Sequence, residues 1–306
     1  MPDKVTLSKQ RTEGIMFKRL FASRKNPYIP GLNNPEHIIL NIGGCRLEMD
    51  IPPHYDSAAY EKEPTDVPNI YDASLYESNS DSHFYNPNGA FLFNGLLPIS
   101  RYWEFLGPFW YDQYLGLTKF LVSVLRVDCL TEGMSCLNPD HFEQVILRFL
   151  FDKGPDSPDL IKKIAPVNWQ IKEIGHQPWV LFEQREDDPN QDITGANFHS
   201  YAATAIDDRY FLLVYFINFG YTPSELSIAN MNAFKDRIMD SVRWQLSDAA
   251  QKRLQEVKTQ WPDAKLSQHR KPEDWVYPEW RRGDKQKGEP NIVILKRNTP
   301  PPEFKI

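Results

Sequence analysis

The chain has 306 residues, of which 41% are hydrophobic and 25% charged, a composition typical of a globular protein with a sizeable core. Its net charge of −6 hides an uneven distribution, because both ends are basic while residues 36–261 hold 18 basic and 32 acidic side chains, a net charge of −14. So acidic a body argues against a nucleic-acid surface, which needs clustered Lys and Arg, and it suits a basic protein partner.

The cysteines give no sign of disulfides or zinc. Cys45, Cys129 and Cys136 are widely spread and include no Cys-x-x-Cys pair, so we expect free thiols in a reducing compartment. No signal-peptide core is visible near the N-terminus, and no apolar run approaches the roughly 20 residues that span a bilayer. The sequence predicts a cytoplasmic protein without a membrane span.

The first third of the chain contains one clear element. Residues 1–35 are polar, basic and interrupted by proline, which predicts an N-terminal extension. Apolar residues from Ile38 to Ile42 and from Cys45 to Ile51, around Gly43-Gly44, then predict a β-hairpin. Residues 53–118 begin with many Tyr, Pro, Asn and Ser and without sustained periodicity, so we predict a long loop-rich insertion.

Aromatic residues are densest at the end of this insertion. They are Tyr102, Trp103, Phe105, Phe109, Trp110, Tyr111 and Tyr114. Two interpretations are open: a loop buried by its own rings, or an exposed aromatic patch like those that anchor protein interfaces. The sequence does not choose between them. As a testable prediction we take the second: Trp103, Trp110, Tyr111 and Tyr114 bind a protein partner, with Trp103, Trp110 and Tyr111 at or near the surface. Acidic residues in the same insertion would steer a basic partner toward the rings.

The middle of the chain alternates between strands and a helix. Residues 119–129 favour a strand through their β-branched residues, with a short helix as the alternative. Asn138 and Pro139 are the cap and first residue of a helix to about residue 151. Two further strands are predicted at 168–174 and 179–184.

The segment 198–261 carries the strongest pattern. Residues 198–206 and the apolar run 210–219, joined by Asp207-Asp208, predict a hairpin whose second strand is covered on both faces. Thr222, Pro223 and Glu225 predict a capping box, and apolar residues at steps of three and four from Met231 to Trp261 predict an amphipathic helix over 223–260. Such a helix would be about 57 Å long, which favours a break near Ser247-Asp248.

Residues 262–306 predict a C-terminal tail rich in proline and charge. Its apolar run 292–295 is the only strand that we predict there, and Pro300-Pro301-Pro302 predicts an extended, disordered end.

Local signatures of catalysis are missing from the sequence. It has no nucleotide-binding glycine pattern, no Gly-x-Ser-x-Gly elbow and no His-Glu-x-x-His zinc motif. His176 and His199, if adjacent across the sheet, would form an acid–base pair with Asp207 or Asp208, although a surface role is the simpler interpretation. Cys136 stands five residues before His141, but nothing in the sequence brings a base against it. We predict no catalytic residue, no metal and no cofactor.

The predicted order of elements resembles a known family. It runs strand, strand, insertion, strand, helix, four strands and a final helix that carries Ser241-Val242-Arg243-Trp244. Over residues 37–52 and 119–247 this resembles the Mog1 and PsbP-like domains, in which helices cover an antiparallel sheet and a Ser-Phe-Arg-like triplet closes the last helix. Residues 41–44 and 51–55 also look like the start of some bacterial immunity proteins, which neutralise secreted antibacterial effectors. The resemblance implies binding without catalysis.

We therefore predict one α+β domain over residues 36–261, with a largely antiparallel sheet covered by helices and the insertion at 53–118. The leading functional hypothesis is a non-enzymatic protein-binding protein, such as an immunity or adaptor protein that holds a basic partner. One alternative is a hydrolase-like enzyme with a dispersed site between the sheet and the insertion. The other is a structural subunit of a larger assembly.

Overall fold

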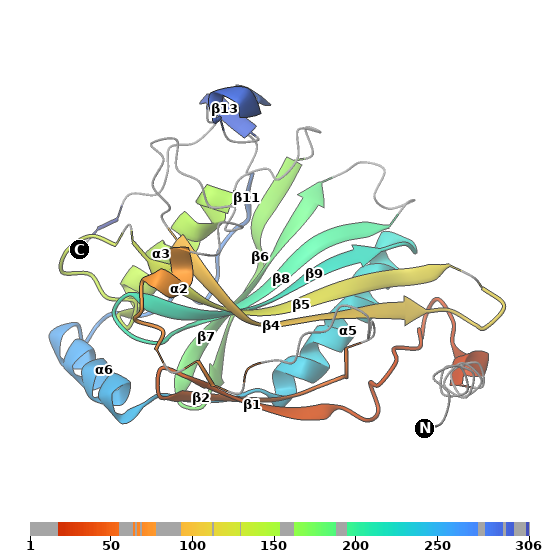
Figure 1. The fold of residues 1–306 in the computed structure, drawn as a ribbon, viewed down its shortest axis with the longest axis horizontal. Coiled ribbons are helices and arrows are strands. Elements are labelled where there is room, and N and C mark those ends of the chain that lie inside the picture. Colours follow the sequence, from red (N-terminus) through yellow and green to blue (C-terminus); the bar gives the residue numbers. More distant parts are fainter. Residues whose placement is uncertain are drawn as a thin grey trace.

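The computed structural model describes residues 18–54, 64, 66–67, 69–77, 93–111, 113–128, 130–153, 162–187, 195–274, 279–289, 292–296 and 304–305. Its largest element is a seven-stranded antiparallel sheet in the order β11-β6-β7-β8-β9-β5-β4 (Figure 1). The strands are β4 (Phe93–Leu106), β5 (Tyr114–Val127), β6 (Lys162–Ile174), β7 (Gln177–Asp187), β8 (Ala196–Ala205), β9 (Tyr210–Gly220) and β11 (Glu273–Asp274). With its helices this makes the α+β class and the largely antiparallel sheet predicted from the sequence.

A second sheet has four strands, in the order β10-β2-β1-β3. They are β1 (Glu36–Ile42), β2 (Cys45–Ile51), β3 (Asp66–Val67) and β10 (Arg243–Gln245), and only the β1–β3 pair is parallel. The predicted hairpin is confirmed, since Ile42 pairs with Cys45 and both Gly43 and Gly44 have positive φ angles. Positive φ at both central residues is what a two-residue hairpin turn requires. A separate pair is formed by β12 (Glu279–Arg282) and β13 (Ile292–Lys296).

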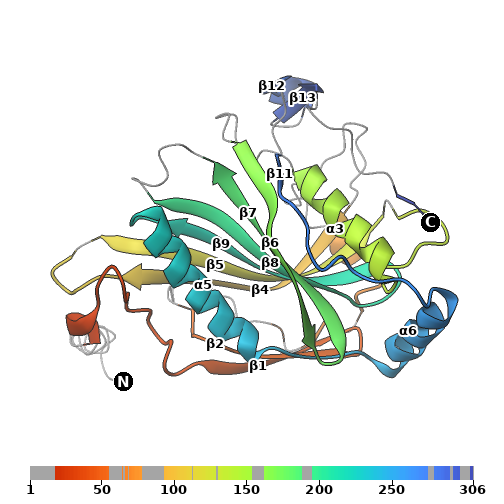
Figure 2. The same cartoon turned by 180° about the vertical axis from the view of Figure 1, so that it is seen from behind.

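The helix α5 (Ser224–Ser241) contacts both sheets (Figure 2). Its Phe234 ring meets Trp103 and Phe105 of β4 edge-on, with ring centroids 5.1 and 5.5 Å apart. At its other end, Ser241 Oγ accepts a hydrogen bond of 2.9 Å from the backbone N–H of Asp50 in β2. The helix therefore contacts the large sheet at Phe234 and the second sheet about two turns further on, at Ser241.

The single helix predicted over 223–260 is wrong, although its apolar stripe is buried as predicted. The chain leaves α5 after Ser241, adds β10 to the second sheet and enters α6 (Asp248–Gln260) after Ser247. Ser247 Oγ caps α6 by accepting a hydrogen bond of 3.2 Å from Ala250 N–H, so the predicted break near Ser247-Asp248 is confirmed. The buried stripe is Met231, Phe234, Ile238, Val242, Leu246, Ala250, Leu254 and Val257.

The predicted capping box of α5 does not form. Pro223 is the N-cap residue and no side chain caps the helix, because the Thr222 hydroxyl bonds to Ser227 Oγ at 2.8 Å instead.

The helix α3 (Pro139–Lys153) packs on the other face of the large sheet. Its Phe142 and Phe149 contact Phe211 of β9 edge-on, whereas Phe216 of β9 contacts Phe120 of β5 on the side of α5. Residues 211 and 216 point to opposite faces because side chains alternate along a strand. Asn138 caps α3 as predicted, with its Oδ1 accepting a hydrogen bond of 2.9 Å from Asp140 N–H.

Two regions predicted as irregular contain ordered strands. Within the predicted insertion 53–118, residues 93–106 form β4, which pairs along its length with β5. Residues 119–127, which follow the insertion, belong to β5, so the strand favoured there is confirmed. Within the predicted tail 262–306, β11 pairs with β6 and β12 pairs with β13, so the strand at 292–295 is confirmed but is not the only one. The segment Pro300–Pro302 and most of residues 55–92 lie outside the described residues.

The first part of the predicted tail packs on the domain. Leu266 is buried, and the backbone oxygen of Ser267 accepts a hydrogen bond of 2.7 Å from Trp169 Nε1. Arg270 forms an ion pair with Glu143 of α3. The remaining short elements are a 3-10 helix at Arg19–Phe21, α2 (Ser74–Glu77) and a 3-10 helix at Lys285–Lys287. Among the helices described, none combines the length and apolar character needed to cross a membrane.

Candidate functional site

Exposed aromatic side chains gather at the connection between β4 and β5. Phe109 and Trp110 lie in this connection with their rings 4.9 Å apart, and Tyr114 begins β5. Trp110 is 66% exposed, and Phe109 and Tyr114 are also exposed. Together with Phe21 and Tyr221 we call these five residues the aromatic tip.

Phe21 and Tyr221 come from distant parts of the sequence. The 3-10 helix that contains Phe21 lies beside the β4–β5 connection (Figures 1 and 2), and Phe21 is 88% exposed. Tyr221 follows β9, donates its N–H to the Leu115 carbonyl at 2.9 Å and is exposed. The aromatic tip thus joins three segments of the chain.

Arg19 stabilises the conformation of the β4–β5 connection. Its Nε donates to the Gly107 carbonyl at 2.8 Å, and its Nη2 donates to the carbonyls of Pro108 and Tyr111 at 3.0 and 2.9 Å. Because one guanidinium satisfies three carbonyls of the loop, the exposed rings stand on an ordered support.

The four predicted binding residues have different positions. Trp110 and Tyr114 are exposed and Tyr111 is half-buried against the core. Trp103 is 0% exposed, its ring packs between Phe120 and Phe234, and its Nε1 donates to the Pro53 carbonyl at 3.0 Å. The prediction that Trp103 lies at the surface is wrong, because it occupies the face of β4 that points toward α5.

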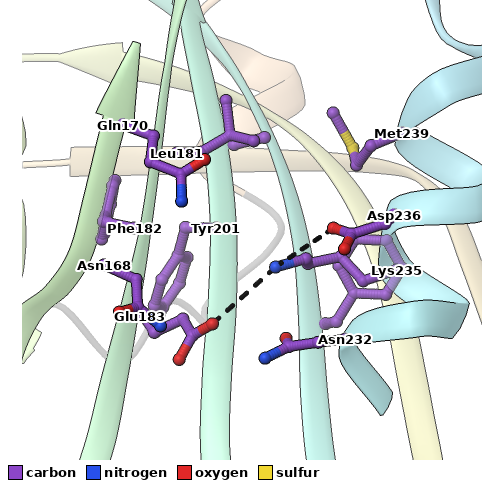
Figure 3. Close-up of a pocket in the computed structure, with 12 residues that line it drawn as sticks. Asn168, Gln170, Leu181, Phe182, Glu183, Tyr201, Asn232, Lys235, Asp236 and Met239 are labelled. Carbon is purple, nitrogen blue, oxygen red and sulfur yellow. Dashed lines mark ion pairs between the residues drawn. The ribbon is translucent and has the colours of Figure 1, made fainter. Parts of the chain in front are cut away.

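A second feature is a pocket of about 180 Å³ between β6, β7, β8, β9 and α5 (Figure 3). Its polar lining consists of Asn168, Gln170, Glu183, Asn232, Lys235 and Asp236, and we call it the charged pocket. Asn168 has a φ of 53° and lies where β6 loses register with β7, so this wall is an irregular part of the strand.

The charges of this pocket are arranged around a buried carboxylate. Arg185 Nε and Nη2 donate to Glu183 Oε2 at 2.8 and 2.6 Å. Lys235 Nζ lies 3.7 Å from Glu183 Oε1 and 3.5 Å from Asp236 Oδ1, between the two carboxylates (Figure 3). The Oδ1 atom of Asn232 is buried without a hydrogen-bond partner.

A further pocket of about 330 Å³ lies between the start of α3, the end of α6, the first residues of β7 and the last residues of β8. Most of its lining is apolar, including Phe142, Val257 and Trp261, and Cys136 is among the lining residues. Nothing in its lining forms a recognisable catalytic arrangement.

The acid–base pair considered from the sequence does not form. His176 lies in the turn before β7 with its side chain 99% exposed, whereas His199 pairs with Gln184 near the other end of that strand. Asp207 lies in the turn after β8, away from His199. Neither histidine lines either of these two pockets. The cleft that the enzyme hypothesis places against residues 53–118 involves segments that lie largely outside the described residues.

His141 has a structural role. Its Nδ1 accepts a hydrogen bond of 3.2 Å from Ser135 N–H, and burial lowers the pKa of its imidazole. Among the residues that the structure describes, no group of His, Cys, Asp and Glu side chains is arranged to hold a metal ion.

The chain matches no protein-family model, and no curated protein matches it significantly. Sequence reasoning missed Phe21, Tyr221 and all the charged-pocket residues, because each set comes from segments that only the fold brings together.

Proposed function

We propose that the protein is a non-enzymatic protein-binding protein that holds a protein partner with its aromatic tip. The observation that carries the proposal is the exposure of Trp110 among four other exposed rings on a support ordered by Arg19. Tyr and Trp give large contact areas at low cost in conformational entropy, and they are enriched among residues that dominate binding energy.

The partner is proposed to be basic. Residues 36–261 carry a net charge of −14, which would speed the encounter with a basic surface. The residues next to Phe21 in the sequence include four basic ones: Lys18, Arg19, Arg24 and Lys25. We therefore propose that the acidic residues of 36–261 attract the partner over a distance. The aromatic tip then forms the contact that keeps it bound.

An adaptor or immunity role is the finer form of the proposal. It rests on the resemblance to Mog1 and PsbP-like domains and to bacterial immunity proteins, both of which imply binding without catalysis. Cys45 and Cys136 are buried cysteines, and the proposed location is the cytoplasm, where thiols stay reduced.

Affinity capture with matched variants tests the proposal. The immobilised full chain is incubated with native lysate, and proteins retained by the wild type, Trp110→Ala and Leu97→Ala are compared by mass spectrometry. Leu97 is the control because it is an exposed apolar residue on the same hairpin, remote from the aromatic tip. We expect a basic protein to be retained by the wild type and by Leu97→Ala and lost by Trp110→Ala. Equal retention by Trp110→Ala, or no retained protein at low salt, would contradict the proposal.

A further inference from the structure

We propose that the charged pocket binds a neutral, hydroxyl-rich molecule the size of a monosaccharide. The pocket is separate from the aromatic tip, since it lies between β6, β7 and α5 rather than at the β4–β5 connection. The proposed ligand binding is therefore independent of the proposed protein-binding function, and the two can be tested separately.

The charge balance of the pocket selects a neutral ligand. Glu183 and Asp236 are matched by Arg185 and Lys235 through the ion pairs already described. A ligand carrying a net charge would leave one charge unbalanced beside a carboxylate that is almost fully buried, which is costly. A neutral ligand leaves the ion pairs intact.

The open hydrogen-bonding positions select hydroxyl groups. Asn232 Oδ1 is an acceptor without a donor among the described residues. Within the same part of the chain, the polar group placed at Glu183 Oε1 is Lys235 Nζ at 3.7 Å, a distance too long for a hydrogen bond. Lys235 Nζ, also 3.5 Å from Asp236, has donor capacity left. The pocket thus offers two acceptors and one donor, and neighbouring hydroxyls of a polyol donate to the first two and accept from the third.

Size and lining agree with this class. A water occupies roughly 30 Å³ of liquid, so about 180 Å³ corresponds to about six waters, which is close to the volume of one six-membered polyol ring. Leu181, Phe216 and Met239 add apolar lining to the pocket. Such walls suit the C–H faces of a sugar, while Glu183, Asn232 and Lys235 face its hydroxyls.

Saturation-transfer NMR on the full chain tests the proposal. The neutral probes are D-glucose, D-galactose, D-mannose and myo-inositol, and the ionic probes are acetate and ethylammonium. We expect at least one neutral probe to bind and neither ionic probe to do so. Asn232→Ala should weaken that binding roughly tenfold, because it removes an acceptor bonded to ligand. Alanine has the higher helix propensity, so the variant should remain folded, which its melting curve verifies.

Lys235→Met is the second variant and should weaken binding to a similar extent by removing the donor. Arg237→Ala is the matched control on α5, because Arg237 is exposed and does not line the pocket. It should bind like the wild type, as should Trp110→Ala. The proposal is overturned if no neutral probe binds, if an ionic probe binds in their place, or if the affinity of folded Asn232→Ala equals that of the wild type.

Discussion

At the scale of single residues, two tryptophans seven positions apart have opposite roles. Trp103 is 0% exposed and contacts both a neighbouring strand and α5, whereas Trp110 is 66% exposed beyond the end of β4. The aromatic residues of 102–114 therefore lie partly in the core and partly at the surface. The buried interpretation holds for Trp103, and the exposed interpretation holds for Trp110.

Trp103→Ala should lower the free energy of unfolding by about 3 to 5 kcal/mol, because it leaves a cavity beside Phe120 and Phe234. Trp110→Ala should change it by less than about 1 kcal/mol, since an exposed side chain loses few contacts. Urea denaturation of both variants provides the measurement. Equal losses would mean that Trp110 is also part of the core.

Asp207 is a partly buried carboxylate in the turn between β8 and β9. Its Oδ1 accepts hydrogen bonds from the N–H groups of Arg209 and Tyr210, at 2.9 and 3.0 Å, and the Tyr71 hydroxyl also bonds to it. Burial raises the pKa of this carboxyl above its ordinary value of 3.8, an effect larger than the opposite one of the hydrogen bonds. The folded state thus holds the proton more tightly than the unfolded state.

The stability contributed by this proton is fully present below pH 3.8 and is lost as the pH rises through the folded pKa. Asp207→Asn keeps an acceptor for both N–H groups but does not titrate. Between about pH 4 and about pH 7 we therefore expect the stability of Asp207→Asn to increase relative to the wild type. Urea denaturation at the two pH values checks this, and a difference that stays constant or decreases with pH would show that Asp207 is not the group responsible.

At the scale of elements, α5 is the helix that packs against both sheets. Ile238, on its buried side, is 1% exposed, so the arrangement expected from the apolar stripe holds over this helix. Ile238→Asp should lower the free energy of unfolding by more than about 3 kcal/mol, because it places a carboxylate in an apolar site, where a charge without a compensating partner is costly.

Arg237→Ala, one position away on the exposed side, should stay within about 0.5 kcal/mol of the wild type. Thermal or urea denaturation of the pair separates the two outcomes. If Ile238→Asp melted like Arg237→Ala, α5 would not be packed as described.

Elements with an uninterrupted local pattern were predictable. The hairpin at 38–51 carries apolar residues around a short Gly-Gly turn, and the hairpin at 198–219 ends in a nearly continuous apolar run. The strands of both form as predicted. The strand β4 was missed because Gly95 and Pro98 interrupt its pattern and a register shift between Leu96 and Ile99 changes its phase. The break after α5 was anticipated from length alone, but the pairing of β10 with β2 depends on contacts about 200 residues apart, which no local pattern encodes.

At the scale of the whole molecule, both candidate sites depend on segments distant in sequence. Trp110 and Tyr114 were predictable from ring density. Phe21 joins them through contacts between distant segments, which include those of Arg19 with the β4–β5 connection, and Tyr221 joins them through the end of β9. Glu183 and Lys235 carry no motif, since a buried ion pair between a strand and a helix is specified by packing. The acidic character of the body was readable directly from composition.

The central claim is that the aromatic tip holds a protein partner, and the dissociation constant of the captured partner for Trp110 variants tests it most directly. Isothermal titration of the purified pair should show Trp110→Ala binding at least about 30-fold more weakly than the wild type, the loss typical of a central aromatic contact. Trp110→Phe should retain most of the affinity, and both variants should melt within a few degrees of the wild type. Unchanged affinity of a folded Trp110→Ala would contradict the claim.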